Sequence, residues 1–305
     1  MKRFNNILVL SREGAGDTQT LAGAMALATR NQARLTVVDV IDKPLKNVRT
    51  AMPPNDLRNH VIEARREQLR RFVEPMQREG VCVNIDVLAG APYVQIVREV
   101  LRNGHDLLIM TATGKTGLKT RLFGSTSLHL LRQCPCPVWI VNPARSMRYS
   151  RIMAAVDLDT SDEEKNQLNA EIMDLAISLA RLEDSELHVV HAWPGWEVNY
   201  LRKQEVVEEV TRQAFAARKK RIEELLGSYS LEALRYRVHL LKGDPGMLIS
   251  HLAAQQRVEL IVMGMVFRTG LAGLLLGNTA ETVLQHVCCS VLAVKPKTFA
   301  SPVKW

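Results

Sequence analysis

Glycines and small polar side chains recur at matching positions in the two halves of this chain, in a spacing that suits phosphate binding. In the second half, Gly264 precedes Gly277-Asn278-Thr279. In the first half, Gly114 precedes Gly124-Ser125-Thr126, with nine residues between the two glycines. Glycine lets a backbone approach a phosphate closely, and the N–H groups that begin a helix favour an anion. Each segment is a candidate phosphate-binding loop, although its hydroxyl or amide groups could instead cap a helix.

An acidic residue ends the first apolar segment of the second half. Asp157 follows the run 152–156, whereas Arg12 occupies the matching position in the first half. A carboxylate can accept hydrogen bonds from a base or a ribose, but a guanidinium offers only donors. We therefore expect the second half to hold the more complete site, with an Asx-type turn at Asp157 as the structural alternative.

Motifs of a complete catalytic centre are absent from the sequence. It contains no G-x-S-x-G elbow, no H-E-x-x-H pair and no phosphate loop ending in Gly-Lys-Ser. His188 and His191 lie in one apolar segment, but side chains alternate along a strand, so the two rings face opposite sides of a sheet. No carboxylate cluster suited to Mg²⁺ is apparent. We expect no catalysis beyond slow ATP hydrolysis, and a role for Mg²⁺ stays open.

The candidate loops are parts of an internal repeat. A shift of 153 residues aligns Gly90-Ala91-Pro92 with Gly243-Asp244-Pro245, and Cys136-Pro137-Val138 with Cys289-Ser290-Val291. Each copy alternates short apolar segments with amphipathic ones, which predicts alternating strands and helices. The expected strands are 5–10, 34–41, 82–88, 106–111 and 137–142 in the first copy, and about 150–156, 185–192, 235–241, 258–263 and 289–295 in the second. The expected helices of the first copy are 18–32, 56–79, 92–103 and 124–133.

This alternation determines the expected fold class. Short, almost wholly apolar strands suit a parallel sheet that is covered by helices on both faces. We predict an α/β protein of two tandem Rossmann-like domains, each with a five-stranded parallel sheet, packed as a pseudo-dimer. The domains are expected at residues 1–145 and 149–305, on either side of a polar join that contains Pro143. A single large domain with ten strands is the alternative.

Composition and charge disfavour several classes of protein. Of the 305 residues, 47% are hydrophobic and 24% are charged, as in soluble globular domains. No apolar run reaches the ~20 residues of a membrane-spanning helix. The net charge is +8, but basic residues alternate with acidic ones in 58–71 and 202–221. Such mixed charge is typical of a solvated helix face rather than of a nucleic-acid surface.

The five cysteines predict no disulfide framework. Their number is odd, and neither Cys134 with Cys136 nor the adjacent Cys288 and Cys289 has a spacing that favours pairing. Packing at the entry of a strand is the expected role, with incidental metal binding as the alternative. This cysteine usage fits a reducing, cytoplasmic location.

Taken with the fold pattern, both loops resemble the G-x2-G-x9-G-(S/T) loop of the universal stress protein family. In the first copy, Thr111 stands in place of the first glycine. In the second copy, Phe267 replaces the second glycine and Asn278 replaces the serine. The resemblance covers essentially the whole chain. It implies adenine nucleotide alpha hydrolase-like domains and a role in the stress response.

The resemblance also implies a ligand and the residues that would hold it. ATP or AMP is the implied ligand, contacted by an aspartate after the first strand and by backbone after the second. The ligand residues carried over to this chain are Asp157, Ala192, Gly264, Arg268, Gly277, Asn278 and Thr279 in the second copy, and Gly114, Gly124, Ser125 and Thr126 in the first. Phe267 would be strained if the backbone there needed a positive φ. The loop could then be rearranged around another phosphate-bearing ligand.

The predicted function is a binding or regulatory module in which the second copy holds the small ligand and the first is mainly structural. One alternative is a slow nucleotide phosphohydrolase, and another is a pure interaction scaffold. A third is a carrier of an amphipathic phosphate-bearing ligand. The anion of that ligand would lie at the helix start at Gly277 and its apolar part against Phe267 and the methionines. An apolar wall could be formed there by Met263, Met265, Val266, Trp193 and Trp196. Pairing of two whole chains into a homodimer is left open.

Overall fold

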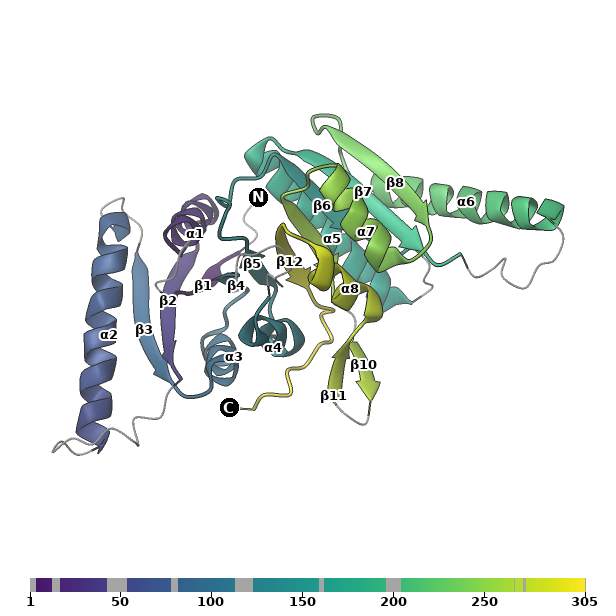
Figure 1. Ribbon diagram of the computed structural model, residues 1–305. Coiled ribbons are helices and arrows are strands. Elements are labelled where there is room, and N and C mark those ends of the chain that lie inside the picture. Colours follow the sequence, from purple (N-terminus) through teal and green to yellow (C-terminus); the bar gives the residue numbers. More distant parts are fainter. Residues whose placement is uncertain are drawn as a thin grey trace. The chain divides into compact units, whose positions relative to one another are not determined.

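A computed structural model describes residues 4–12, 17–42, 54–77, 82–112, 123–158, 162–195, 204–265, 267–270 and 273–304. The chain forms two compact units, one of residues 1–148 together with 300–305, the other of residues 149–299. Each unit is an α/β fold with a parallel sheet, as the strand and helix alternation predicts (Figure 1).

The first unit contains a five-stranded parallel sheet in the order β3-β2-β1-β4-β5. Its strands are β1 (Asn6–Leu10), β2 (Arg34–Ile41), β3 (Val83–Ala89), β4 (Leu107–Thr111) and β5 (Val138–Val141). Its helices are α1 (Asp17–Asn31), α2 (Pro54–Gln77), α3 (Pro92–Asn103) and α4 (Ser125–Gln133). Every residue of β1, β4 and β5 is buried, because helices cover both faces of the sheet.

The second unit repeats this sheet in the order β8-β7-β6-β9-β12, again wholly parallel. Its strands are β6 (Arg151–Ala155), β7 (Glu186–Trp193), β8 (Tyr236–Lys242), β9 (Leu260–Gly264) and β12 (Ser290–Val294). Its helices are α5 (Glu163–Glu183), α6 (Gln204–Gly227), α7 (Pro245–Gln255) and α8 (Asn278–His286). The same strand order in both units follows from the same alternating sequence pattern.

Right-handed crossovers decide which face of the sheet each helix covers. In each unit the chain moves outward through three strands and then returns to the other side of the first strand. The first two helices therefore cover one face and the last two cover the other. Figure 1 shows the resulting neighbours, α3 beside α4 and α7 beside α8. The strand order reverses between β6 and β9, and at such a point α/β sheets leave a crevice at their carboxyl edge.

Capping residues mark the ends of several helices. Asp162 caps α5 by accepting a hydrogen bond from the Glu164 N–H, and Asp244 accepts one from the Met247 N–H at the start of α7. Helix α3 ends at Gly104, whose φ of 63° lies in the left-handed region that glycine tolerates best.

Two features depart from the sequence expectation. A hairpin of β10 (Phe267–Gly270) and β11 (Gly273–Leu276) forms within the stretch expected as a glycine-rich loop. In addition, residues 300–305 group with the first unit, although 149–305 was expected as one domain. The Arg98 side chain of α3 donates a hydrogen bond to the Lys304 carbonyl, which ties this segment to the first unit.

Candidate functional site

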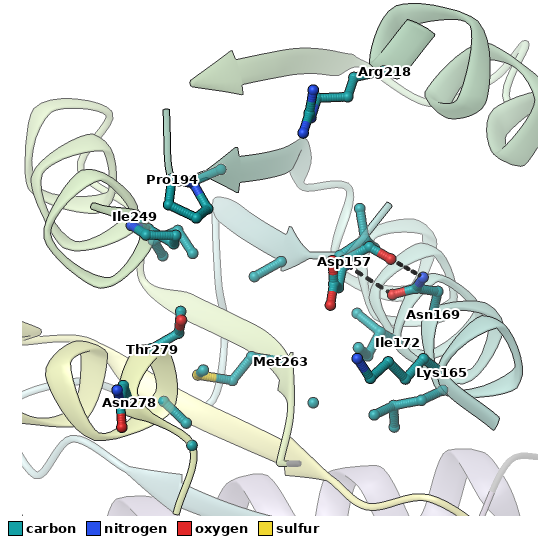
Figure 2. A pocket seen from close by; sticks show the side chains of 18 of the residues that line it. Asp157, Lys165, Asn169, Ile172, Pro194, Arg218, Ile249, Met263, Asn278 and Thr279 are labelled. Atoms are coloured by element: carbon teal, nitrogen blue, oxygen red, sulfur yellow. Dashed lines mark hydrogen bonds between the residues drawn. The ribbon is translucent and has the colours of Figure 1, made fainter. Parts of the chain in front are cut away.

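A cleft of about 660 Å³ opens at the carboxyl edge of the second sheet, where the strand order reverses between β6 and β9 (Figure 2). It brings together six of the seven ligand residues that the sequence predicts for this half. They are Asp157, Ala192, Gly264, Gly277, Asn278 and Thr279. Residues separated by more than a hundred positions meet there because parallel strands end at a common edge.

The backbone of Asp157 is held by a reciprocal pair of hydrogen bonds. Its N–H donates to Asn169 Oδ1 at 2.9 Å, and Asn169 Nδ2 donates back to the Asp157 carbonyl at 2.6 Å (Figure 2). Asn169 lies on α5 and is buried, whereas Asp157 is exposed at the cleft. The amide side chain thus satisfies the backbone where β6 ends and leaves the aspartate at the cleft wall.

The residue after Asp157 is anchored as well. The Leu158 N–H donates to His191 Nδ1 at 3.2 Å, and Arg221 Nη1 donates to the Leu158 carbonyl at 2.7 Å. The same Nδ1 lies 3.1 Å from the Val156 carbonyl oxygen, and the tautomer of the ring decides which of the two backbone groups it pairs with. His191 therefore has a structural contact that supports the turn after β6, and it does not line the cleft.

Helix α8 begins at the opposite side of the cleft from Asp157. Its N-cap is Gly277, with φ −62° and ψ 145° and no side-chain cap. Asn278 and Thr279 are exposed residues of the first helical turn that line the cleft. The N–H groups of this first turn are the ones that favour an anion.

Three basic side chains at the cleft were missed by the sequence reasoning. They are Lys165 of α5 and Arg218 and Arg221 of α6. The two arginines fall in the mixed-charge stretch that was interpreted as a solvated helix face. Their i,i+3 spacing on one side of α6 was the available signal. The Arg218 guanidinium lies 4.5 Å from the ring centroid of Trp193, which fixes its position by a cation–π contact.

Part of the cleft wall is apolar. Met263, one of the residues proposed for such a wall, lines the cleft. Ile172 and Ile249, which the sequence analysis did not propose, line it as well. Met265 and Trp193 are instead buried, with 0% and 1% of their surface exposed. Val266 and Trp196 lie outside the described residues. The cleft therefore joins an apolar wall to a cationic and a helix-terminal side.

The backbone at Phe267 is not strained, because Phe267 lies in a strand of the hairpin. Phe267 pairs with Leu276 across the antiparallel ladder, so its backbone is extended and needs no positive φ. Arg268 lies in the same strand opposite Leu275, and only its backbone is described. The extended backbone of the hairpin accommodates a side chain at the position of the family glycine.

The corresponding residues of the first unit share the glycine N-cap of the helix but differ at the end of the first strand. Gly124 is the N-cap of α4, and Ser125 and Thr126 begin the helix without a side-chain cap. Gly114 lies outside the described residues. At the end of β1, the Arg12 N–H donates to Asp17 of α1 at 2.8 Å, so an acidic side chain lies there too, bound to backbone.

The remaining histidine candidate lies on the other face of β7. His188 Nδ1 is 3.0 Å from His239 Nε2 of β8, and the rings stack. Burial lowers the pKa of both histidines below the ordinary value of 6.5. Neither ring lines the cleft. His188 and His191 lie on opposite faces of β7, as the alternation of side chains along a strand predicts.

The described part of the chain offers neither a cluster of metal ligands nor a membrane-spanning helix. No group of three or more His, Cys, Asp or Glu side chains there could hold a metal ion. No helix among those residues is long and apolar enough to cross a membrane.

Comparison with known proteins agrees with the duplicated fold. The model of the universal stress protein family matches residues 3–142 and again 148–295. Universal stress protein E of Escherichia coli K12 is 29% identical over 317 residues, which cover 100% of this chain and 98% of the relative. A Haemophilus influenzae homologue of that protein is 26% identical, with coverage of 96% and 98%.

Solved structures show the same architecture. A universal stress protein structure from Pseudomonas aeruginosa UCBPP-PA14 superposes with a TM-score of 0.71 at 26% identity, over 97% of this chain and 95% of the other. One from Archaeoglobus fulgidus gives a TM-score of 0.67 at 18% identity, over 95% and 98%, which shows a shared fold. Because the family model matches nearly all of both halves, this chain belongs to the universal stress protein family, in its tandem-domain form.

Proposed function

We propose that the second unit binds a nucleotide, or a closely related phosphate-bearing small molecule, in the cleft between β6 and β9, and that the protein acts as a ligand-responsive regulator under stress. The observation that carries this proposal is the convergence on one cleft of Asp157, three basic side chains and the glycine-capped start of α8. The Asp157 carboxylate can accept hydrogen bonds from a ribose or a base, and the basic side chains and the helix start suit phosphates.

The charge distribution supports a ligand with two chemically different ends. A phosphate chain fits the N–H groups at the start of α8. On the other side of the cleft, Arg221 donates to the Leu158 carbonyl next to Asp157, so a cationic group lies there too. A neutral hydrogen-bonding part fits Asp157 across the cleft. Membership in the family supports the stress-response role, since the relatives carry that name.

The test is thermal unfolding of the whole protein against ATP and AMP, with and without Mg²⁺. A ligand that binds only the native state at one hundred times its Kd adds about 2.7 kcal/mol to the free energy of unfolding. Asp157→Asn should remove most of that gain, because the amide replaces one acceptor oxygen with a donor. The matched control is Asp184→Asn, which makes the same change at a fully exposed carboxylate of the same unit. Equal stabilisation of Asp157→Asn and wild type would contradict the proposal.

The apolar wall favours one second candidate, an amphipathic ligand with a phosphate head. Ile172, Ile249 and Met263 would contact its apolar part. Native mass spectrometry of freshly purified protein distinguishes the two candidates. A copurified mass that is released by organic solvent supports the amphipathic ligand, whereas an apo mass that shifts on adding ATP supports the nucleotide.

A further inference from the structure

Two thiols lie side by side where α4 ends and β5 begins in the first unit. The segment is Cys134-Pro135-Cys136-Pro137, and its two Sγ atoms are 3.5 Å apart. All five cysteines of the chain are thiols in this structure. The spacing in sequence gave no reason to expect this pair, so the three-dimensional contact is a new observation.

The sequence holds the two sulfurs in place through its prolines. A residue before proline is disfavoured in the helical region, and Cys134 has φ −70° and ψ 129°, which ends α4. Its N–H still donates to the Leu130 carbonyl at 2.9 Å. On the other side, the Leu108 N–H of β4 donates to the Pro137 carbonyl at 3.0 Å. The short segment is thus anchored to a helix at one end and to the sheet at the other.

The equivalent turn of the second unit has a cysteine at only one of these two positions. Val287 and Cys289 occupy the positions of Cys134 and Cys136. Val287 is the C-cap of α8 with φ −84° and ψ 146°, so the two helices end with the same backbone geometry. This turn therefore does not need a thiol at its first position, and valine fills that position in the repeat. A thiol at the first of these two positions is therefore a feature of the first unit, whereas the second unit has Cys288 directly before Cys289.

We propose that Cys134 and Cys136 form a reversible redox site, in which a small peroxide converts the two thiols into an intramolecular disulfide. A disulfide has an S–S distance of about 2.0 Å, so the sulfurs must approach by about 1.5 Å from their present 3.5 Å. A neighbouring thiol at this distance makes the second step effectively unimolecular. The site is independent of the cleft and lies in the other unit.

The chemistry balances without a further reactant. The thiolate of Cys136, whose residue is 7% exposed against 0% for Cys134, attacks one peroxide oxygen and breaks the O–O bond. This step gives a sulfenic acid and, after proton transfer, water. The Cys134 sulfur then attacks the sulfenic sulfur, the S–S bond forms, and the hydroxyl leaves as a second water with the thiol proton. Both sulfurs are oxidised and the peroxide is reduced.

The test measures the pair in the folded whole protein. Reduced protein is treated with hydrogen peroxide, its remaining thiols are alkylated, and tryptic peptides are weighed. Residues 133–145 form one such peptide with Cys134 and Cys136 as its only cysteines, while Cys82 and the Cys288-Cys289 pair fall in two others. We expect peptide 133–145 to lose two hydrogens and both alkylation sites, and to regain them after dithiothreitol.

The matched variant is Cys134→Val, which copies the residue of the repeat. It should retain the native circular dichroism spectrum and leave Cys136 unable to form an intramolecular disulfide. The proposal is overturned if wild-type peptide 133–145 stays fully alkylatable while the exposed Cys82 and Cys288 are oxidised. It is equally overturned if the pair oxidises only in denatured protein, or if Cys136 passes to irreversible oxygen adducts with Cys134 still a thiol.

Discussion

At the scale of single residues, the site depends on a side chain whose importance is invisible in the sequence. Asn169 is one of many polar residues in a helix, and nothing in its spacing marks it. In the structure it satisfies both backbone groups of Asp157. Asp157 itself was predictable, because it follows an apolar strand. Its partner was not, because pairing depends on how α5 packs against β6.

Asn169→Ala should lower the free energy of unfolding by about 1–3 kcal/mol, since two backbone groups lose their partner. It should also weaken nucleotide binding, because the turn that carries Asp157 is released. Urea unfolding measures the first effect and calorimetric titration the second. The control is Gln167→Ala on the same helix, whose exposed amide donates to the Glu163 side chain, and a change within about 0.5 kcal/mol is expected there. Equal stability of Asn169→Ala and wild type would contradict this role.

The His188–His239 pair should make stability depend on pH. Burial lowers the pKa of both rings, so the unfolded chain binds protons at a higher pH than the folded chain does. The free energy of unfolding is therefore expected to fall as the pH drops below about 6.5, the ordinary value. Glu186 opposes this shift at His188, whereas Arg237 and Arg151 reinforce it.

Urea unfolding at a series of pH values tests this dependence. Replacing both His188 and His239 with glutamine should flatten the decline below pH 6.5, because no proton is then taken up on unfolding at these sites. His60→Gln, at an exposed position on α2, should leave the decline unchanged. An identical slope in the double variant and wild type would show that other groups are responsible.

At the scale of elements, the strands and helices followed from the alternating pattern, but the hairpin did not. Residues 264–277 were interpreted through glycine spacing, which predicts a loop. The run Gly273–Leu276 pairs instead with Phe267–Gly270, and a short-range ladder overrides the motif. Pairing of two four-residue segments leaves little trace in periodicity, so the sequence could not distinguish the two paths.

Phe267→Gly should weaken the hairpin rather than restore a family-like loop. Glycine in a strand costs about 0.5–1 kcal/mol through lost conformational entropy of folding. We expect faster amide hydrogen exchange across residues 267–276, with β6 and β9 of the same protein serving as unchanged internal references. Unchanged exchange together with tighter ATP binding would show that a glycine loop is the functional form.

At the scale of the whole molecule, the duplication and the α/β fold were predictable, since they depend on patterns that extend over many residues. Asp157 and Arg12 predict that the second unit holds the more complete site, which stays a prediction. The cationic side of the cleft in the second unit was not predictable, because Arg218 and Arg221 resemble the other charged residues of a long helix. Their direction is set by packing of α6 near Trp193.

Nucleotide binding should protect the two units unequally. In hydrogen exchange with and without ATP, we expect slower exchange at the end of β6, in β9 and in the first turn of α8. The matching residues of β1, β4 and α4 should exchange as before, because Arg12 replaces the aspartate there. Equal protection of both units would show that the first has kept a working site.

Residues 300–305 are synthesised after the second unit, yet they belong to the unit that is synthesised first. Domains generally begin to fold as they emerge, so the first sheet can assemble while the second unit is still being translated. The Arg98 side chain, however, meets the Lys304 carbonyl only after the second unit has been synthesised. Completion of the first unit is thereby postponed until translation of the second is finished.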